Sequence, residues 1–167
     1  DFGNGSTKAY CIFDVRHLHC FTFYYYSNMD VEFRFMSKID DYAEEFSFLD
    51  DDDRLYHLID LAKRPTNLPV ELRTDDRKVN GCMSQIWVDV GIQNELVTVY
   101  YDSDAMITKG ITSVVADCFS DIPVNEAKEI TKEDFEKLGI KELLSAQRRN
   151  GLGSLIQTIS SKVHALE

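Results

Sequence analysis

Cysteine and histidine are scarce in this sequence, which has four of each in 167 residues. A zinc site or an iron-sulfur cluster usually needs three or four Cys or His ligands at set spacings, and no Cys-x-x-Cys pair is present. After residue 36 the only imidazoles are His57 and His164, both far in sequence from any candidate nucleophile. We therefore expect neither a metal site in the core nor a hydrolase.

Phosphate-binding loops, long apolar runs and excess positive charge are also lacking. Gly151 and Gly153 lie inside a helical pattern with no strand before them, which does not fit a dinucleotide-binding turn. No stretch approaches the roughly 20 apolar residues of a membrane-spanning helix. The 18 Lys and Arg against 29 Asp and Glu give a net charge of -11, which disfavours nucleic acid and anionic membranes as partners. Unpaired cysteine spacing predicts a reduced, cytoplasmic protein.

Two parts of the chain differ in composition. Residues 1–35 hold ten of the 19 aromatic residues (10 Phe, 8 Tyr and 1 Trp) and show no helical or strand periodicity. We interpret them as an N-terminal extension of unknown role, either disordered or foreign to the native chain, with an organelle-targeting segment as the alternative. Residues 36–167 are predicted to form one folded domain. Four metal-capable side chains of the extension match no standard finger spacing: Cys11, His17, His19 and Cys20.

Helical signals open the folded part. Ser37, followed three residues later by Asp40, predicts a capping box at the start of a first helix. The acidic run at 50–53 predicts the first turn of a second helix, which Pro65 ends.

Alternating β-branched residues predict strands in the middle of the chain. Ile and Val occupy every second position over 86–92, and after a Gln93-Asn94 turn the pattern continues over 96–101, which predicts a hairpin. Val79 is expected to close a third, shorter strand.

Three further helices are predicted after the hairpin. They cover residues 105–119 with Ser103 as the cap, residues 131–139 with Thr131 and Asp134 in the capping interaction, and residues 147–165. The last of these helices is expected to carry five apolar residues on one side: Leu152, Leu155, Ile156, Ile159 and Val163. Strands in the middle with helices at both ends predict the α+β class, with a small antiparallel β-sheet of about three strands packed against flanking helices.

One cysteine stands at a predicted turn. Asn80-Gly81 permits a positive φ and a sharp reversal, so Cys82 is expected at the tip of a loop. The residues alone leave two interpretations open for Cys82, a reactive thiol or a small hydrophobic residue of the core. Cys118, in the middle of a predicted helix, is assigned to the core.

Residues 79–87, Val-Asn-Gly-Cys-Met-Ser-Gln-Ile-Trp, resemble the active-cysteine signature of the SufE family of cysteine desulfuration proteins. Residues 103–110 are similar to the family's Ser-Asp-Ala block, and residues 144–152 to its C-terminal Arg-containing block. The similarity covers about residues 37–165 in the family's order. The sequence departs from the family at four places that remove no reactive group: Met83 for Gln, Ile86 for Val, Ala62 for Gly, and Ala146-Gln147 for Pro and Ser/Thr.

The resemblance implies a SufE-like fold and a sulfur acceptor. The Cys82 thiolate would take the outer sulfur of a persulfide on a cysteine desulfurase, stimulate that enzyme and pass the sulfur to a downstream iron-sulfur scaffold protein. It implies no bound cofactor, because the pyridoxal phosphate belongs to the partner, and a monomer when free. The rival hypothesis is an allosteric desulfurase-binding regulator in which Cys82 carries no sulfur.

Three more residues are candidates near the cysteine. The guanidinium of Arg148 would hold a thiolate or persulfide anion or an acidic group of the partner, with an ordinary surface ion pair as the alternative. Asp104 is a candidate catalytic residue, with a helix cap as the alternative. Trp87 is expected in the core or as a wall over the cysteine loop. We also expect this loop to shelter the sulfur in the free protein.

Overall fold

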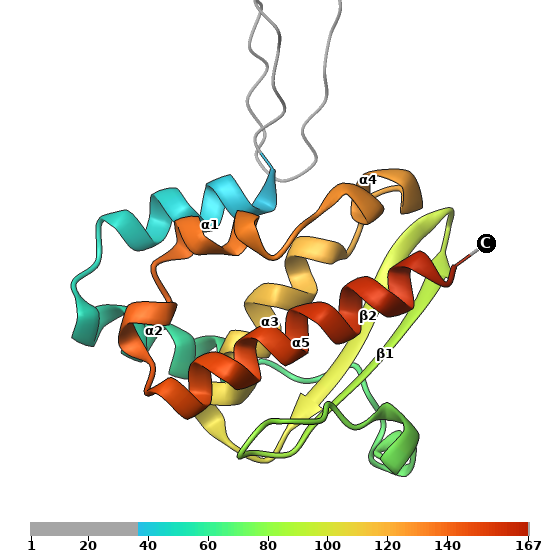
Figure 1. Ribbon diagram of the computed structural model, residues 1–167, viewed down its shortest axis with the longest axis horizontal. Helices are drawn as coiled ribbons and strands as arrows, with labels where there is room; N and C mark the ends of the chain where they lie inside the picture. Colours follow the sequence, from blue (N-terminus) through green and yellow to red (C-terminus); the bar gives the residue numbers. More distant parts are fainter. Residues whose placement is uncertain (1–36, 167) are drawn as a thin grey trace, which may run out of the picture. The chain divides into compact units, whose positions relative to one another are not determined.

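The computed structural model describes residues 37–166 of the chain (Figure 1). The proposed extension and its cysteines and histidines lie outside the described residues, so the predicted domain boundary stays a prediction. The elements, in chain order, are α1 (Lys38–Ser47), α2 (Asp51–Ala62), the 3-10 helices η1 (Val70–Leu72) and η2 (Asp75–Arg77), β1 (Ile86–Gln93), β2 (Leu96–Ser103), α3 (Met106–Phe119), α4 (Val124–Glu129), the 3-10 helices η3 (Glu133–Leu138) and η4 (Lys141–Leu143), and α5 (Ala146–His164).

The first two helices begin where the sequence predicts. The backbone N–H of Asp40 donates to the side chain of Ser37, and that of Asp53 donates to the side chain of Asp50, so each helix has a side-chain N-cap. Within residues 37–166, no helix has both the length and the apolar character needed to cross a membrane.

The sheet has two antiparallel strands rather than about three. β1 pairs with β2 through a two-residue turn, in which Asn94 and Glu95 have φ values of 51° and 67°. The predicted third strand is wrong. Val79 donates its N–H to the Ile86 carbonyl at 2.8 Å, but the ladder stops at a single bridge because the chain turns at Gly81, where φ is 83°.

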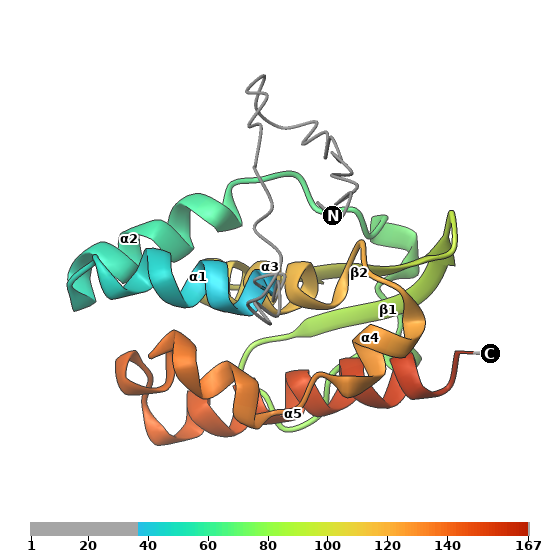
Figure 2. The same ribbon diagram turned by 90° about the horizontal axis from the view of Figure 1, so that it is seen from above.

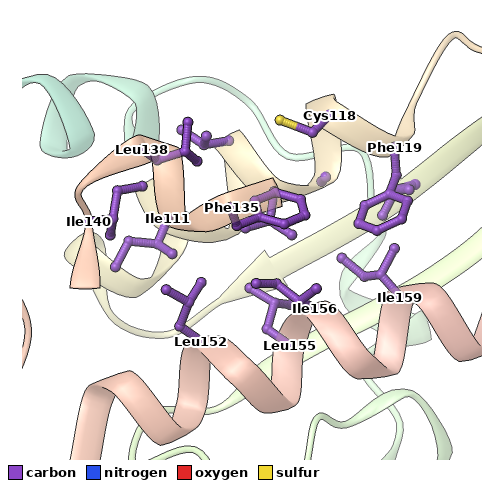
Figure 3. Close-up of a cluster of buried hydrophobic side chains, with 14 of the residues drawn as sticks. Ile111, Cys118, Phe119, Phe135, Leu138, Ile140, Leu152, Leu155, Ile156 and Ile159 are labelled. Atoms are coloured by element: carbon purple, nitrogen blue, oxygen red, sulfur yellow. The ribbon is translucent and has the colours of Figure 1, made fainter. Parts of the chain in front are cut away.

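Three layers form the domain (Figure 2). α2 lies on one side of the layer made by α3 and the hairpin, and α5 lies on the other side. Figure 3 shows the apolar side chains of α5 directed at a cluster from α3 and η3, in which the rings of Phe119 and Phe135 stack with centroids 5.8 Å apart. The predicted inner face of the last helix is confirmed, since all of its predicted residues are buried: Leu152, Leu155, Ile156, Ile159 and Val163.

Two predicted caps differ in the structure. Ser103 does not cap α3: Ala105 is the N-cap without a side-chain hydrogen bond, and the Ser103 hydroxyl donates to the Gln85 carbonyl at 2.8 Å. Thr131 and Asp134 do interact, with the Thr131 N–H donating to Asp134 Oδ2 at 2.9 Å. The segment that follows is nevertheless the 3-10 helix η3 rather than an α-helix. The short α4 has no predicted counterpart, because six residues are too few to show periodicity.

A glycine fixes the spacing of α2 and α3. A Cβ on Gly110 would lie 2.0 Å from the carbonyl oxygen of Leu58, a backbone atom that cannot move aside. We expect Gly110→Ala to lower the free energy of unfolding by about 3 kcal/mol, the upper end of the usual overpacking cost. Gly153→Ala is the matched control, because a Cβ there meets only the flexible end of Lys132, at 3.3 Å. Urea unfolding of both variants measures the difference, and equal stability would contradict the assignment.

Candidate functional site

Cys82 lies in the loop that leads into β1, and its half-buried side chain rests on α5. Gly81 has the positive φ that the sequence predicts. Two glycines permit the close contact. A Cβ on Gly151 would lie 3.1 Å from the Cys82 sulfur, and a Cβ on Gly81 would lie 3.1 Å from the Ser154 hydroxyl. The loop therefore lies directly on the helix surface.

A small cavity of about 30 Å³ adjoins the thiol. This volume has room for one or two water-sized groups. The hydroxyls of Ser84 and Thr108 line it and are hydrogen-bonded to each other at 3.1 Å. The other lining residues are mostly apolar and come from the loop, β1, α3 and α5: Cys82, Met83, Ile86, Ile111, Arg148, Gly151, Leu152 and Leu155.

The position of the Cys82 sulfur against α5 favours the neutral thiol over the thiolate. Burial raises the pKa of Cys82 above its ordinary value, because partial desolvation penalises the thiolate. The Cys82 S–H also donates to the Gly151 carbonyl at 3.4 Å, a contact that a thiolate could not make. The expected shelter is consistent with this half-buried position. Cys118 is buried in the core, as assigned, and desolvation raises its pKa to about 12.

Arg148 lines the same cavity from the first turn of α5. Arg148 is exposed, and no ion pair among residues 37–166 includes it. The structure thus brings Arg148 and Cys82 to one cavity and gives no support to the surface ion pair. The guanidinium is available to an anion there.

Asp104 holds the end of the cysteine loop. Its Oδ1 accepts a hydrogen bond from the Gln85 N–H at 2.9 Å, and its own N–H donates to the Gln85 carbonyl at 3.2 Å. Asp104 does not line the cavity and makes no side-chain cap for α3. It therefore anchors the loop at Gln85, a few positions after Cys82 along the chain, and is not a group beside the thiol.

Comparison with known proteins places these features in a family. Residues 40–163 match the family model for SufE, described as the Fe-S metabolism associated domain. The chain belongs to the SufE family. Membership associates the domain with Fe-S metabolism and agrees with the resemblance seen in the cysteine-containing segment.

Two relatives agree with this membership, and a solved structure has the same fold. An uncharacterised SufE-like protein of Rhizobium etli is 37% identical over 139 residues, covering 78% of this chain and 94% of that protein. A SufE-like protein of Arabidopsis thaliana, named chloroplastic/mitochondrial, is 36% identical over 107 residues, which cover 64% of this chain and 29% of that protein. The solution structure of a hypothetical protein from Thermus thermophilus matches with a TM-score of 0.65 and 20% identity, over 77% of this chain and 94% of that one, which confirms the α+β fold.

The outer face of the SufE hairpin carries a buried charge that sequence reasoning missed. Asp102 is 2% exposed and forms ion pairs with Arg73 and, at 3.4 Å, with Lys109. Its strand partner Trp87 is half-buried, points away from the cavity and has the Arg73 guanidinium 5.8 Å from its ring centroid. The expectation that Trp87 belongs to the core or covers the cysteine loop is therefore wrong. A carboxylate inside an apolar strand pattern is the signal that could have indicated this cluster.

A methyl group at residue 151 tests whether the Cys82 sulfur rests on α5. We expect Gly151→Ala to push the Cys82 loop off α5 and to raise the rate of iodoacetamide alkylation of Cys82 at pH 7.5 by about fivefold or more. The exposed thiol loses the desolvation that raises its pKa, so its thiolate fraction increases, and the sulfur becomes accessible to the reagent. Peptide-level mass spectrometry measures the rate. Gly153→Ala is the control on the same helix, and Cys118 should stay unmodified in both. An unchanged alkylation rate in Gly151→Ala would show that contact with α5 does not protect the Cys82 sulfur.

Arg148 is tested by comparing an anionic with a neutral reagent. We expect Arg148→Gln to slow alkylation of Cys82 by iodoacetate about fivefold relative to iodoacetamide, since one nearby charge contributes about 1 kcal/mol. Arg149→Gln carries the same charge change but lies outside the cavity, so its effect on the ratio should be smaller. Equal effects of the two substitutions would show that Arg148 has no special access to the sulfur.

Proposed function

We propose that this SufE-family protein accepts sulfur on Cys82 from a cysteine desulfurase and passes it to a scaffold protein for iron-sulfur cluster assembly. One observation carries the proposal: a thiol on a glycine-hinged loop lies beside a cavity of about 30 Å³, enough for one additional sulfur atom. Family membership and the association with Fe-S metabolism support it.

The transfer conserves atoms and electrons. The Cys82 sulfur attacks the outer sulfur of a persulfide on the desulfurase, so that one S–S bond forms on Cys82 and the S–S bond of the donor breaks. The donor cysteine leaves as a thiolate and takes up the proton that Cys82 loses. No external oxidant or reductant is needed, because one persulfide replaces another.

The position of the cysteine loop determines whether the Cys82 sulfur is protected or reactive. While Cys82 is seated on α5, burial keeps the thiol neutral and keeps large reagents away from the sulfur. Movement of the loop outward, when the desulfurase docks, removes the desolvation and the contact with the Gly151 carbonyl, and so favours the reactive thiolate. After transfer, Arg148 would hold the persulfide anion as the loop returns, which is the role we propose for it.

Under this proposal the carrier needs no cofactor of its own, since pyridoxal phosphate performs its chemistry on the desulfurase. Asp104 acts as a positioning residue through Gln85 and not as a catalytic residue. For the compartment we keep the cytoplasm as the expectation and an organelle as the alternative, which the name of the Arabidopsis relative supports.

Mass spectrometry tests the relay directly. After incubation with cysteine and a pyridoxal-phosphate desulfurase, without reductant, we expect the Cys82 peptide to gain the mass of one sulfur atom. Cys82→Ser should gain none and should no longer stimulate the desulfurase. Arg148→Gln should load more slowly than Arg64→Gln, a control that removes an unpaired cation away from the cavity and the groove.

Two outcomes would overturn the proposal. Absence of the mass gain with an active desulfurase of the same source would exclude transfer to Cys82. Full stimulation of the desulfurase by Cys82→Ser would favour the allosteric regulator, in which the domain acts by docking alone.

A further inference from the structure

Cations that lack a carboxylate partner gather around the cysteine loop. Nine Lys and Arg residues between 37 and 166 form ion pairs within 4.0 Å, and six do not. Four of these six line the cavity of Cys82 or the groove beside it, namely Lys78, Lys132, Arg148 and Arg149. The other two, Arg64 and Lys128, line neither. In a chain with a net charge of -11, this local excess of unpaired positive charge needs an explanation.

The groove next to the cysteine loop has a volume of about 740 Å³ and is polar. Lys132 reaches over α5 at Gly153, where a Cβ would lie 3.3 Å from the ammonium nitrogen. Lys78 half-buries its side chain near the start of the cysteine loop, and its ammonium donates to the Gln85 side chain at 3.3 Å. The groove is lined by three segments of the chain: Asp76, Lys78 and Asn80; Lys132; and Arg149, Asn150, Gly153, Ser154, Gln157 and Thr158.

The charge of the groove is positive. Three cations line the groove against one acidic residue, Asp76, which lies 3.4 Å from the Arg77 guanidinium, a group that it shares with Asp89. Lys78, Lys132 and Arg149 have no such neighbour among the described residues. Between these cations stand amide and hydroxyl side chains, which can pair with the N–H and C=O groups of a peptide. Cations spread over three segments and separated by amides suit an extended chain with several carboxylates better than one compact phosphate.

We propose that this groove binds an acidic peptide segment of the protein that exchanges sulfur with Cys82. The identity of that partner rests on the proposed function, whereas the chemistry of the groove does not. The groove and the cavity share the cysteine loop: Asn80 lines the groove, Cys82 lines the cavity, and Gly81 between them rests on Ser154 of the groove. A segment bound in the groove therefore touches the loop that carries the thiol.

A labelled peptide tests the groove without sulfur transfer. The probe is fluorescein-(Glu-Gly)4, and the protein is the full chain carrying Cys82→Ser, which cannot accept sulfur. We expect anisotropy to show binding that weakens about tenfold between 50 and 500 mM NaCl. Lys132→Gln combined with Arg149→Gln should weaken it roughly fivefold or more. Arg64→Gln combined with Lys128→Gln removes two unpaired cations elsewhere and should change it less than about twofold.

Amide chemical shifts on titration locate the peptide. The largest shifts should fall on Asn80, Gly81, Asn150 and Gly153. Equal weakening by the two double variants, equal binding of the (Gln-Gly)4 peptide, or shifts centred elsewhere would each overturn the proposal. Displacement of the peptide by an equal concentration of inorganic phosphate would overturn it as well, because the groove would then be a phosphate site. Since the experiment uses Cys82→Ser, failure of the relay leaves its result unaffected.

Discussion

The contact between the cysteine loop and α5 sets the geometry of this domain's chemistry. The loop lies close to the helix because glycine stands on both sides of the contact: Gly81 faces the small side chain of Ser154, and the side chain of Cys82 faces Gly151. The opposite side of α5 keeps the helix in place. The apolar residues of α5 are buried against α3 and η3 (Figure 3), so the helix cannot shift without opening the core. One element therefore serves as core and as support for the sulfur.

Two adjacent arginines of α5 line different parts of the surface. Arg148 and Arg149 are neighbours in the sequence, yet successive helical positions are turned by about 100° and so face different surroundings. Arg148 lines the cavity of the thiol, and Arg149 lines the polar groove. Most other cations of the domain are paired with carboxylates, including the two that surround buried Asp102 on the outer face of the hairpin. Unpaired positive charge is thus concentrated at the face that carries Cys82.

The sequence predicts what depends on local patterns. Periodicity predicts the hairpin and the inner face of α5, Ser37 predicts the start of α1, and Asn80-Gly81 predicts the turn before Cys82. Errors arise where a distant partner takes over a polar group. The hydroxyl of Ser103 donates to the Gln85 carbonyl and accepts from the N–H of Ala105, one residue before α3, and the Asp104 carboxylate accepts from the Gln85 N–H. Trp87 faces Arg73, which is 14 positions earlier in the chain. Such pairings depend on the fold and have no signature in residue spacing.

Burial protects the sulfur of Cys82, whereas sulfur transfer requires an accessible sulfur. The free energy needed to move the loop away from α5 decides whether both conditions can be met. Beyond Ser84 the chain is fixed by Asp104 and Ser103 through Gln85, and before Cys82 it can turn at Gly81. Opening between these points breaks the Ser84–Thr108 hydrogen bond and the weak thiol contact to Gly151. Two such hydrogen bonds and one small apolar side chain amount to about 2–4 kcal/mol. On the proposed function, this cost corresponds to an open loop populated at roughly 0.1–3%, which would protect the sulfur in the free protein and leave a cost that binding of a partner would offset.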